Sequence, residues 1–532
     1  MNCAQHLIAL LEAHGVDTAF GIPGVHTIEL YRALGDSRLT HVTPRHEQGA
    51  GFMADGYARA SGKPAACFII SGPGMTNIAT AMGQALADSV PMLVISSVNQ
   101  RATLGRGQGR LHEMPHQGET LAGVSVFNHT LQDPAALPEV LARAFAVFSS
   151  ARPGPVHIEI PLDVMAAPAP EAPAGAPARV FPPAPAPEAL ALAGNWLAAA
   201  ERPLVLLGGG TAAVPDAARA LVERLDAPAF TTINAKGVLG LDHPLDLGAT
   251  QSLPAARRLA READVVLALG TELGETDYDL VFDEGFRLDG RLIRIDIDPQ
   301  QLGRNQAADL AILAEAGQAM QGLLQQLPDA AERGGADRAA EVRGELALAA
   351  DPELAPYAPL YATLREALPE AIVVGDSTGP VYAGNFLAAM PAPRRWFNAA
   401  TGFGTLGYGL PAALGAALAR PEQPVVALVG DGGLQFVLGE LGTARDLGRP
   451  VALVIWNNDG YDEIRRYMSM SEVPHLGVDL AAPDFRALAE AYACRHLGVS
   501  DPASLHDALG RLSDADSPLI IEVDAAAWAA SL

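Results

Sequence analysis

The sequence predicts an α/β protein with three domains, each a doubly wound parallel sheet. Three observations support this. Apolar, strand-like runs such as ACFIIS, ADVVLALG and PVVALV alternate with helical patterns along the whole chain, which is typical of a parallel sheet with helices on both faces. The length of 532 residues exceeds what one hydrophobic core usually organises. A run rich in proline and alanine, residues 166–189, interrupts the alternation.

Changes in composition along the chain predict the domain boundaries. The run at 166–189 has little to bury and disfavours helix, so it is predicted to be an interdomain linker. A softer boundary lies near 328–359, where the polar stretch DAAERGGADRAAEVRGE predicts an exposed helix or loop. Three domains follow, at 1–165, 190–330 and 350–532.

Charge and cysteine content exclude several classes of partner. The formal net charge of −25 at pH 7 would repel a phosphate backbone, so we expect no nucleic acid. No apolar run reaches membrane-spanning length, so we expect no membrane partner.

The three cysteines, Cys3, Cys67 and Cys494, are too scattered for a disulfide framework. The first 15 residues predict an amphipathic helix and not a signal peptide, so a reducing, cytoplasmic location is expected.

The strongest chemical signal is a pair of motifs that follow neighbouring strands. A Gly-Asp-Gly turn at 430–432 follows PVVALV, and Asn458 follows PVALVIW. Glycines let backbone amides approach a diphosphate, and the Asp431 carboxylate, the Asn458 amide oxygen and the Gly460 carbonyl suit Mg²⁺. Gly-Asp-Gly alone is usually a structural turn, but its pairing with Asn458 favours a binding site. The interval from Gly72 to Pro91 nearly equals that from Gly430 to Pro450, which suggests that the outer domains repeat one module.

On these motifs the chain resembles the thiamine-diphosphate enzymes, in particular the acetolactate synthase and 2-oxo-acid decarboxylase branch. The resemblance covers nearly the whole chain, in the order of a pyrimidine-binding, a central and a diphosphate-binding domain. It implies thiamine diphosphate and Mg²⁺ as cofactors. The residues that it assigns to the diphosphate end are Gly430, Asp431, Gly432, Gly433, Asn458, Gly460 and Tyr461.

The resemblance also assigns the pyrimidine end of the cofactor. Glu47, in PRHEQGAGF, matches the glutamate that hydrogen-bonds pyrimidine N1′ and favours the imino tautomer. Alone it would be interpreted as a surface residue before a helix, and the downstream motif makes catalysis the better interpretation. Leu406 matches the apolar side chain that forces the cofactor into a V, with a core leucine as the alternative, and the Gly404 carbonyl would accept a hydrogen bond from the 4′-nitrogen.

Because Glu47 and Asp431 belong to different domains, the cofactor is expected between two domains. In the family these come from different subunits, which implies a homodimer or a dimer of dimers, that is, a homotetramer.

Several segments are expected near the reacting carbon, and Gln117 aligns with a glutamine of the acetolactate synthases. A zinc pair at His112 and His116 is disfavoured, because Pro115 interrupts the helix that would align them. The expected pocket residues are Val25, His26, His112, Glu113, Gln117, Asp462, Glu463 and Ile464.

The chain departs from acetolactate synthases at three places. LGTELGETDYDLVF and LGATQS replace segments associated with bound flavin, which makes FAD doubtful. The family's pocket lysine has no counterpart near FNHTL, where His129 and Thr130 occupy the region. A dedicated acetolactate synthase is therefore disfavoured.

The segments LHEMPHQ, DSTGPVYAGN and NDGYDEIRRYM are more similar to the 5-guanidino-2-oxopentanoate decarboxylase group. A carboxylate would bind the guanidinium of such a substrate bidentately, and the candidates are Glu113, Glu119, Asp462 and Glu463. The expected function is thiamine-diphosphate-dependent decarboxylation of a 2-oxo acid through an enamine intermediate. The alternative is a carboligase, like acetolactate synthase, that joins two 2-oxo acids.

Two further alternatives belong to other classes. A cofactor-binding regulatory protein is disfavoured by the intact Glu47, Asp431 and Asn458. A nicotinamide dehydrogenase would use the glycines at 208–210, but these lack the full dinucleotide-binding spacing, so a structural turn is the preferred interpretation.

Overall fold

The computed structural model of the chain describes residues 1–171, 177–280, 282–329, 332–515 and 517–532. Parts of both predicted boundary regions, residues 172–176 and 330–331, lie outside the described residues. The chain forms two compact units. The outer unit comprises Met1–Val180, Val373–Thr378 and Asn398–Ser531, and the central unit comprises Phe181–Ile372, Gly379–Phe397 and Leu532.

The first sheet belongs to the N-terminal part of the outer unit, the N-terminal module, and all its strands are parallel, in the order β2-β1-β3-β4-β6-β5. Its strands are β1 (Thr18–Gly21), β2 (Thr40–Val42), β3 (Ala66–Ile69), β4 (Met92–Val98), β5 (Phe127–Thr130) and β6 (Pro155–Pro161). The helices along this part are α1 (Cys3–Ala13), α2 (Ile28–Leu34), α3 (Glu47–Ser61), α4 (Pro73–Ala87), α5 (Gln117–Thr120), α6 (Leu137–Ser150) and α7 (Leu162–Met165).

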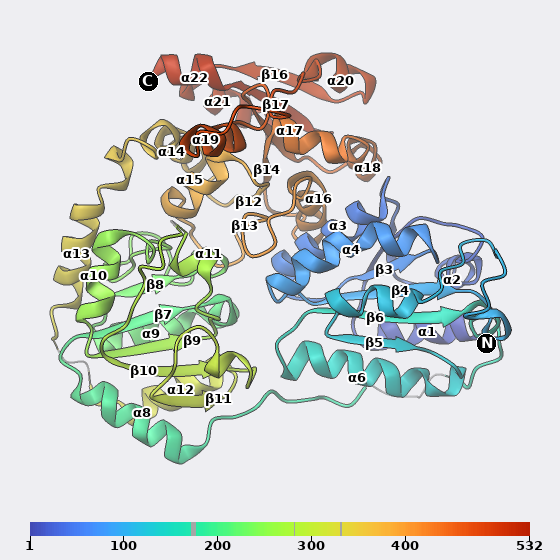
Figure 1. Cartoon of the computed structure of the whole chain (residues 1–532), viewed down its shortest axis with the longest axis horizontal. Helices are drawn as coiled ribbons and strands as arrows, with labels where there is room; N and C mark the ends of the chain where they lie inside the picture. The colour runs from blue at the N-terminus through green and yellow to red at the C-terminus, as the bar shows by residue number, and fades with distance from the viewer. Residues whose placement is uncertain (172–176, 281, 330–331, 516) are drawn as a thin grey trace. The chain divides into compact units, whose positions relative to one another are not determined.

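Helices cover both faces of this sheet. An Asn2–Gln5 capping box starts α1, and the apolar positions of α1 and α6 pack into one core with the strands. Figure 1 shows α3 and α4 on the opposite face. The sheet is therefore doubly wound, with α3 and α4 at the carboxyl ends of strands β2 and β3.

The second sheet lies in the central unit, is also parallel, and has the order β11-β10-β9-β7-β8. One apolar core on it contains α8, α9 and α12, and a separate one contains α10 and α13. A Cβ at Gly208 would lie 2.0 Å from the Gly270 carbonyl oxygen, so close packing accounts for this glycine. The strands are β7 (Pro203–Leu207), β8 (Ala229–Thr231), β9 (Val265–Leu269), β10 (Arg291–Asp296) and β11 (Leu310–Leu313). The helices are α8 (Pro187–Ala199), α9 (Pro215–Leu225), α10 (Pro254–Glu262), α11 (Glu275–Tyr278), α12 (Ala316–Gln326) and α13 (Gly335–Leu346).

The third sheet, that of the C-terminal module, has the order β13-β12-β14-β15-β17-β16. Counted from its first strand, this order is the same as that of the first sheet. Its strands are β12 (Ile372–Gly375), β13 (Trp396–Asn398), β14 (Val425–Gly430), β15 (Ala452–Asn457), β16 (Arg495–Val499) and β17 (Leu519–Asp524). The helices along this part are α14 (Ala358–Ala367), α15 (Gly379–Leu387), α16 (Gly409–Ala419), α17 (Asp431–Leu434), α18 (Glu440–Leu447), α19 (Asp462–Met470), α20 (Phe485–Ala491), α21 (Pro502–Leu509) and α22 (Ala525–Ser531).

Within the outer unit, α3 and α16 pack with their backbones in close approach. A Cβ at Gly56 would lie 2.0 Å from the Ala412 carbonyl oxygen, and one at Gly415 would lie 1.9 Å from the Met53 carbonyl oxygen. Only glycine fits at these two crossings.

The predicted fold class, three doubly wound parallel sheets, is confirmed. The domain boundaries stay a prediction. Among the described helices, none is both long enough and apolar enough to span a bilayer.

Candidate functional site

The Asp431 turn and the Asn458 turn meet at one edge of the third sheet. Strands β14 and β15 are neighbours in register, with Gly430 opposite Trp456, so both chains leave the sheet side by side. The buried Asp431 carboxylate accepts the backbone N–H of Gly460 at 3.0 Å and that of Asn458 at 3.4 Å. The structure thus brings together the three residues predicted to bind Mg²⁺.

Steric constraints explain why two positions in this site are glycine. Gly460 has a φ of +137°, and a Cβ there would lie 2.2 Å from the Val478 carbonyl oxygen. A Cβ at Gly432 would lie 2.7 Å from the ring of Tyr461. The ring of Tyr461 therefore packs over the turn at Gly432, as expected if both line the diphosphate end.

The chemistry of these donors fits a hard divalent cation. Burial raises the pKa of Asp431, and a bound cation would favour its ionised form. The described residues contain no cluster of three or more His, Cys, Asp or Glu side chains suited to a metal. A site here would instead combine one carboxylate with amide and main-chain oxygens, a set that Mg²⁺ accepts when phosphate oxygens and water complete the shell.

The segment carrying Gly404 and Leu406 lies against the same turn. The Leu406 side chain is 3.6 Å from the Cβ position of Gly433. Asp376, at the end of β12, accepts the N–H of Gly407 at 2.9 Å and that of Ser377 at 2.8 Å. Burial raises the pKa of Asp376 to about 6. This carboxyl group, which sequence reasoning did not single out, fixes the backbone just after Leu406.

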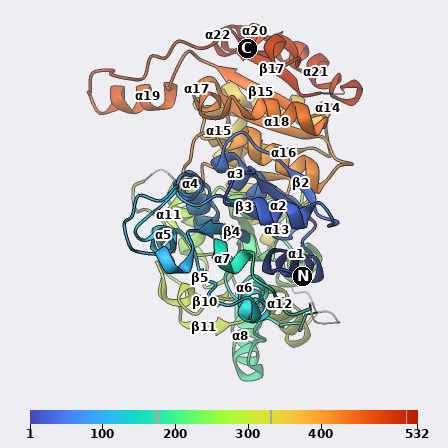
Figure 2. The same cartoon turned by 90° about the vertical axis from the view of Figure 1, so that its right-hand side faces the viewer.

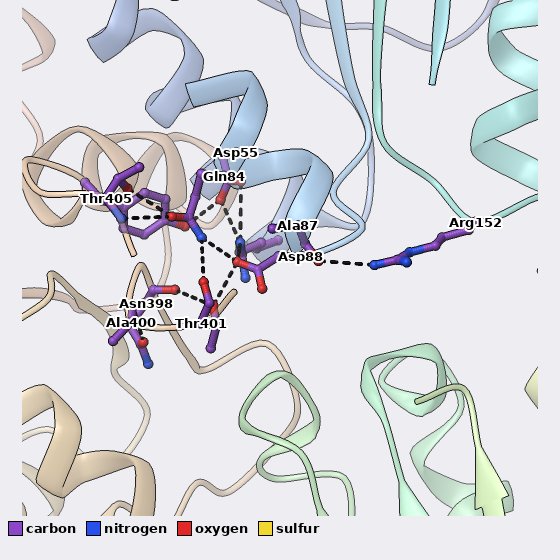
Figure 3. Close-up of polar contacts among 11 residues, drawn as sticks. Asp55, Gln84, Ala87, Asp88, Arg152, Asn398, Ala400, Thr401 and Thr405 are labelled. Carbon is purple, nitrogen blue, oxygen red and sulfur yellow. Dashed lines mark hydrogen bonds and ion pairs between the residues drawn. The ribbon is translucent and has the colours of Figure 1, made fainter. Parts of the chain in front are cut away.

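A buried polar network holds the start of this segment (Figure 3). Gln84 of α4 accepts from the Thr405 hydroxyl at 3.0 Å and donates to Asp88 at 2.7 Å. The Thr401 hydroxyl donates to the same Asp88 carboxylate at 2.8 Å, and Arg59 of α3 donates to it at 2.7 Å. Helices α3 and α4 of the N-terminal module therefore position the loop of the C-terminal module that leads to Leu406.

Glu47 is the first residue of α3 and is largely buried. Its Oε2 accepts from the Asn77 side chain at 2.9 Å, and its Oε1 lies 3.2 Å from the Cβ position of Gly74. The preceding backbone is held by Glu440 of α18, which accepts the N–H of Arg45 at 3.0 Å and that of His46 at 3.1 Å. In the described residues, the side chain of Glu47 bonds within the N-terminal module and not to the Asp431 turn.

Three of the predicted pocket residues lie together at the carboxyl ends of β1, β3 and β4. The His26 ring contacts the Ser71 hydroxyl and meets the His112 ring edge-on at 5.1 Å between centroids. Burial, and next the neighbouring His112, lower the pKa of His26. Gln117 joins this cluster, because its side-chain oxygen accepts the N–H of Gly72 at 3.0 Å.

The other predicted pocket residues are not part of this cluster. Val25 is 65% exposed. The Glu113 carboxylate caps its own loop, where it accepts the N–H groups of Arg110 and Gln108, and these bonds lower its pKa.

Residues 462–464 lie on α19, none of whose residues is buried. Figure 2 shows this helix standing away from the third sheet. Asp462 pairs with Arg465 at 2.8 Å and Glu463 with Arg466 at 2.5 Å, while the Ile464 side chain is exposed. Both carboxylates are therefore already paired with an arginine one turn along the helix.

The chain is similar to known proteins over most of its length. The chain matches three family models, described as the N-terminal TPP binding domain of thiamine pyrophosphate enzymes over residues 1–120, their central domain over 190–323 and their C-terminal TPP binding domain over 374–523. It is 48% identical over 515 residues to "Probable 2-ketoarginine decarboxylase AruI" of Pseudomonas aeruginosa, covering 95% of this chain and 90% of the relative.

Two acetolactate synthases are more distant relatives. The large subunit of Parasynechococcus marenigrum is 32% identical over 98% of this chain and 87% of its own length. The isozyme 1 large subunit of Escherichia coli is 33% identical over 88% of this chain and 83% of its own length. The resemblance inferred from the motifs is confirmed, and the chain belongs to the thiamine pyrophosphate enzyme family.

Proposed function

We propose that this protein is a thiamine-diphosphate- and Mg²⁺-dependent decarboxylase of 5-guanidino-2-oxopentanoate, also called 2-ketoarginine. The observation that carries the substrate assignment is the 48% identity, over 95% of the chain, to a relative named for that activity. The acetolactate synthases, at 32–33% identity, support a carboligase less well.

The proposed cofactor site uses residues at the ends of two sheets. Asp431, Asn458 and the Gly460 carbonyl would bind Mg²⁺, and Gly430 to Gly433 with Tyr461 would hold the diphosphate. Leu406 would support the rings from below, with the Gly404 carbonyl accepting from the 4′-nitrogen. When bound, thiamine diphosphate supplies the nucleophilic carbon and the electron sink that decarboxylation requires.

The protein's own side chains would activate the cofactor and orient the substrate. Glu47 would share its carboxyl proton with pyrimidine N1′, and burial against Asn77 and Gly74 keeps its orientation fixed. His26, His112 and Gln117 would face the 2-oxo group, since they lie together at the ends of the first sheet. Val25, Glu113, Asp462, Glu463 and Ile464 stay candidates for the rim of the pocket.

The proposal includes a homodimer or a dimer of dimers, with Glu47 of one subunit facing Asp431 of another, in the cytoplasm. Its test mixes two inactive variants, Glu47→Gln and Asp431→Ala, under conditions that exchange subunits. If each site is shared, the mixed dimer contains one site with both native residues, and activity returns to about a quarter of the native value. No recovery, although mass spectrometry shows mixed dimers, would place both residues of a site in one subunit.

The substrate is tested with the holoenzyme, by release of carbon dioxide from 5-guanidino-2-oxopentanoate, pyruvate and benzoylformate. The expected result is a clear preference in kcat/KM for the guanidino acid, with 4-guanidinobutanal as the product. Equal or better activity on the neutral acids would overturn the substrate assignment, and an acyloin product would indicate a carboligase.

A further inference from the structure

The N-terminal module contains a pocket of about 390 Å³ beside the His26–His112–Gln117 cluster. Its walls come from residues 114–119, which include the start of α5 at Gln117, and from the end of β5, which includes His129 and Thr130. Pockets of this size accept small organic ligands. One of these segments carries Gln117, which matches a glutamine of the acetolactate synthases, and the other lacks their pocket lysine.

The charge of the pocket is one-sided. Its acidic lining residues are Glu119 and Glu159, and no lysine or arginine lines it. Glu119 is exposed, whereas Glu159 is only 5% exposed and lies in the middle of β6. A neutral or anionic ligand would gain nothing from this arrangement, but a cation would.

Glu159 is hydrogen-bonded but lacks a countercharge. Its Oε1 accepts from the Thr130 hydroxyl at 2.7 Å, and its Oε2 accepts from the Gln117 amide at 3.0 Å. Both donors are neutral, and in the described part of the chain no cationic side chain pairs with it. His157, two residues earlier on β6, does not supply the charge, because burial lowers the pKa of its ring to about 3.

A buried carboxylate without a cation is costly, so its presence calls for an explanation. Only two of its roughly four acceptor positions are used by Thr130 and Gln117. A planar guanidinium can occupy the remaining positions with two parallel N–H bonds. The family's pocket lysine is also missing from this region, so no protein cation fills the space.

Building on the proposed function, we propose that Glu159 binds the guanidinium tail of the substrate and thereby determines specificity. Of the four earlier candidates, Glu113, Asp462 and Glu463 are already bound to backbone amides or arginines. The fourth, Glu119, lines the pocket but is exposed and lies 3.7 Å from the ring of His116. Glu159 is the acidic residue that combines burial, a pocket and the absence of a countercharge in the described structure.

The contacts of Gln117 connect this carboxylate to the reacting end. Gln117 donates to Glu159 at 3.0 Å and accepts from the N–H of Gly72 at 3.0 Å, and Gly74 in the following turn lies against Glu47. An extended substrate spans about 6 Å between its carbonyl carbon and its guanidinium carbon. The amide nitrogen of Gln117 therefore orients Glu159, while its amide oxygen fixes the start of α4 beside Glu47.

The test compares 5-guanidino-2-oxopentanoate with 2-oxoheptanoate, a 2-oxo acid of similar length whose tail is uncharged, in native enzyme and in Glu159→Gln. The measured quantity is the ratio of the two kcat/KM values. We expect Glu159→Gln to lower this ratio at least 100-fold, because glutamine keeps the size but not the charge. Glu345→Gln, which removes an exposed carboxylate paired with Arg258 in the central unit, is the matched control and should keep the native ratio.

The outcomes separate this inference from the proposed function. If native enzyme does not prefer the guanidino acid, the substrate assignment fails, whatever the variant does. If native enzyme prefers it and Glu159→Gln keeps that preference, or loses activity on both acids equally, the role of Glu159 is overturned.

A second variant and a binding measurement remain decisive if Glu159→Gln folds poorly. A Cβ at Gly118 would lie 3.0 Å from Oε1 of Glu159, so Gly118→Ala should obstruct the carboxylate while keeping its charge, and should lower the same ratio. Calorimetry with 5-guanidinopentanoate, which lacks the reactive carbonyl, should detect binding to native enzyme and at least tenfold weaker binding to Gly118→Ala. Equal affinity for both would contradict the inference.

Discussion

In the N-terminal module, strand β3 runs through Gly72 into a single helix of 15 residues, α4. In the C-terminal module, the equivalent strand β14 runs into Asp431, and the helical segment after it is divided into α17, a 3-10 turn and α18. The two sheets nevertheless share one strand order. The same topology therefore carries different chemistry, because different residues follow the same strand.

The two modules also support each other reciprocally. Glu440 of α18 holds the loop that leads to Glu47, through the N–H groups of Arg45 and His46. Gln84 of α4 holds the loop that leads to Leu406, through Thr405. In each case, the helix segment after the third strand of one module positions the loop before a cofactor residue of the other.

This difference teaches where function resides in a repeated fold. Parallel sheets place strand ends at one edge, and that edge is where α/β proteins bind ligands. One module would contribute a carboxyl group for the pyrimidine and the other an oxygen set for the metal. Variants that remove the chemistry of one half of the site should leave the fold of both modules intact, whereas variants of the contacts between the modules should not.

The largest effect is expected for Asp431→Ala. Loss of the carboxylate removes the strongest metal ligand, so the affinity for thiamine diphosphate in the presence of Mg²⁺ should fall on the order of 100-fold or more. Calorimetric titration measures this. Asp484→Ala, which removes a helix cap in the same module, should keep native affinity, and a native-like affinity of Asp431→Ala would remove the metal site from this turn.

The contact between the repeated modules is tested by Gly56→Ala. The added methyl group would press on the Ala412 carbonyl, so α3 and α16 must separate, at a cost of about 2 to 3 kcal/mol. The melting temperature should fall by several degrees. Gly344→Ala is the control, because open space surrounds that glycine in α13, and it should be neutral or slightly stabilising.

The dependence of the free energy of unfolding on pH should reveal the titration of the Asp376 carboxyl group. Its folded pKa of about 6 lies above the ordinary value of 3.8, so the protonated form is the one that folding favours. The resulting stability is present below about pH 4 and is lost as pH rises through about 6, in total about 3 kcal/mol. Relative to native protein, Asp376→Asn should therefore gain stability from pH 4 to pH 7 in denaturant titrations. A constant difference across this range would contradict the assignment.

Much of this could be predicted from sequence, because the signals were local. Buried runs ending in glycine and aspartate predicted the sheets and the Asp431 turn, and the spacing to Asn458 predicted their meeting. Asp376 is the first residue of the segment DSTGPVYAGN, but its role was missed, as were those of Gln84 and Glu440, because the loops that they hold lie far from them along the chain. Glu159 had a weak signal, an acidic residue inside the apolar strand PVHIEIP.

The smallest effects should come from the reciprocal loop contacts. Glu440→Ala leaves the N–H groups of Arg45 and His46 without their acceptor, and Gln84→Ala does the same for Thr405. Each should cost about 1 to 2 kcal/mol. Hydrogen exchange should accelerate at residues 45–47 in the first variant and at 401–406 in the second. Acceleration of both loops by either variant would show a general loosening and not a reciprocal support.

The most direct test of the account is proton exchange at C2 of bound thiamine diphosphate, followed by NMR in deuterium oxide. If the Glu47 carboxyl group activates the pyrimidine, native enzyme should exchange this proton much faster than free cofactor does. Glu47→Gln should then be slower than native enzyme by about 100-fold or more. Equal exchange rates in the two proteins, with the cofactor fully bound in both, would contradict the catalytic role of Glu47.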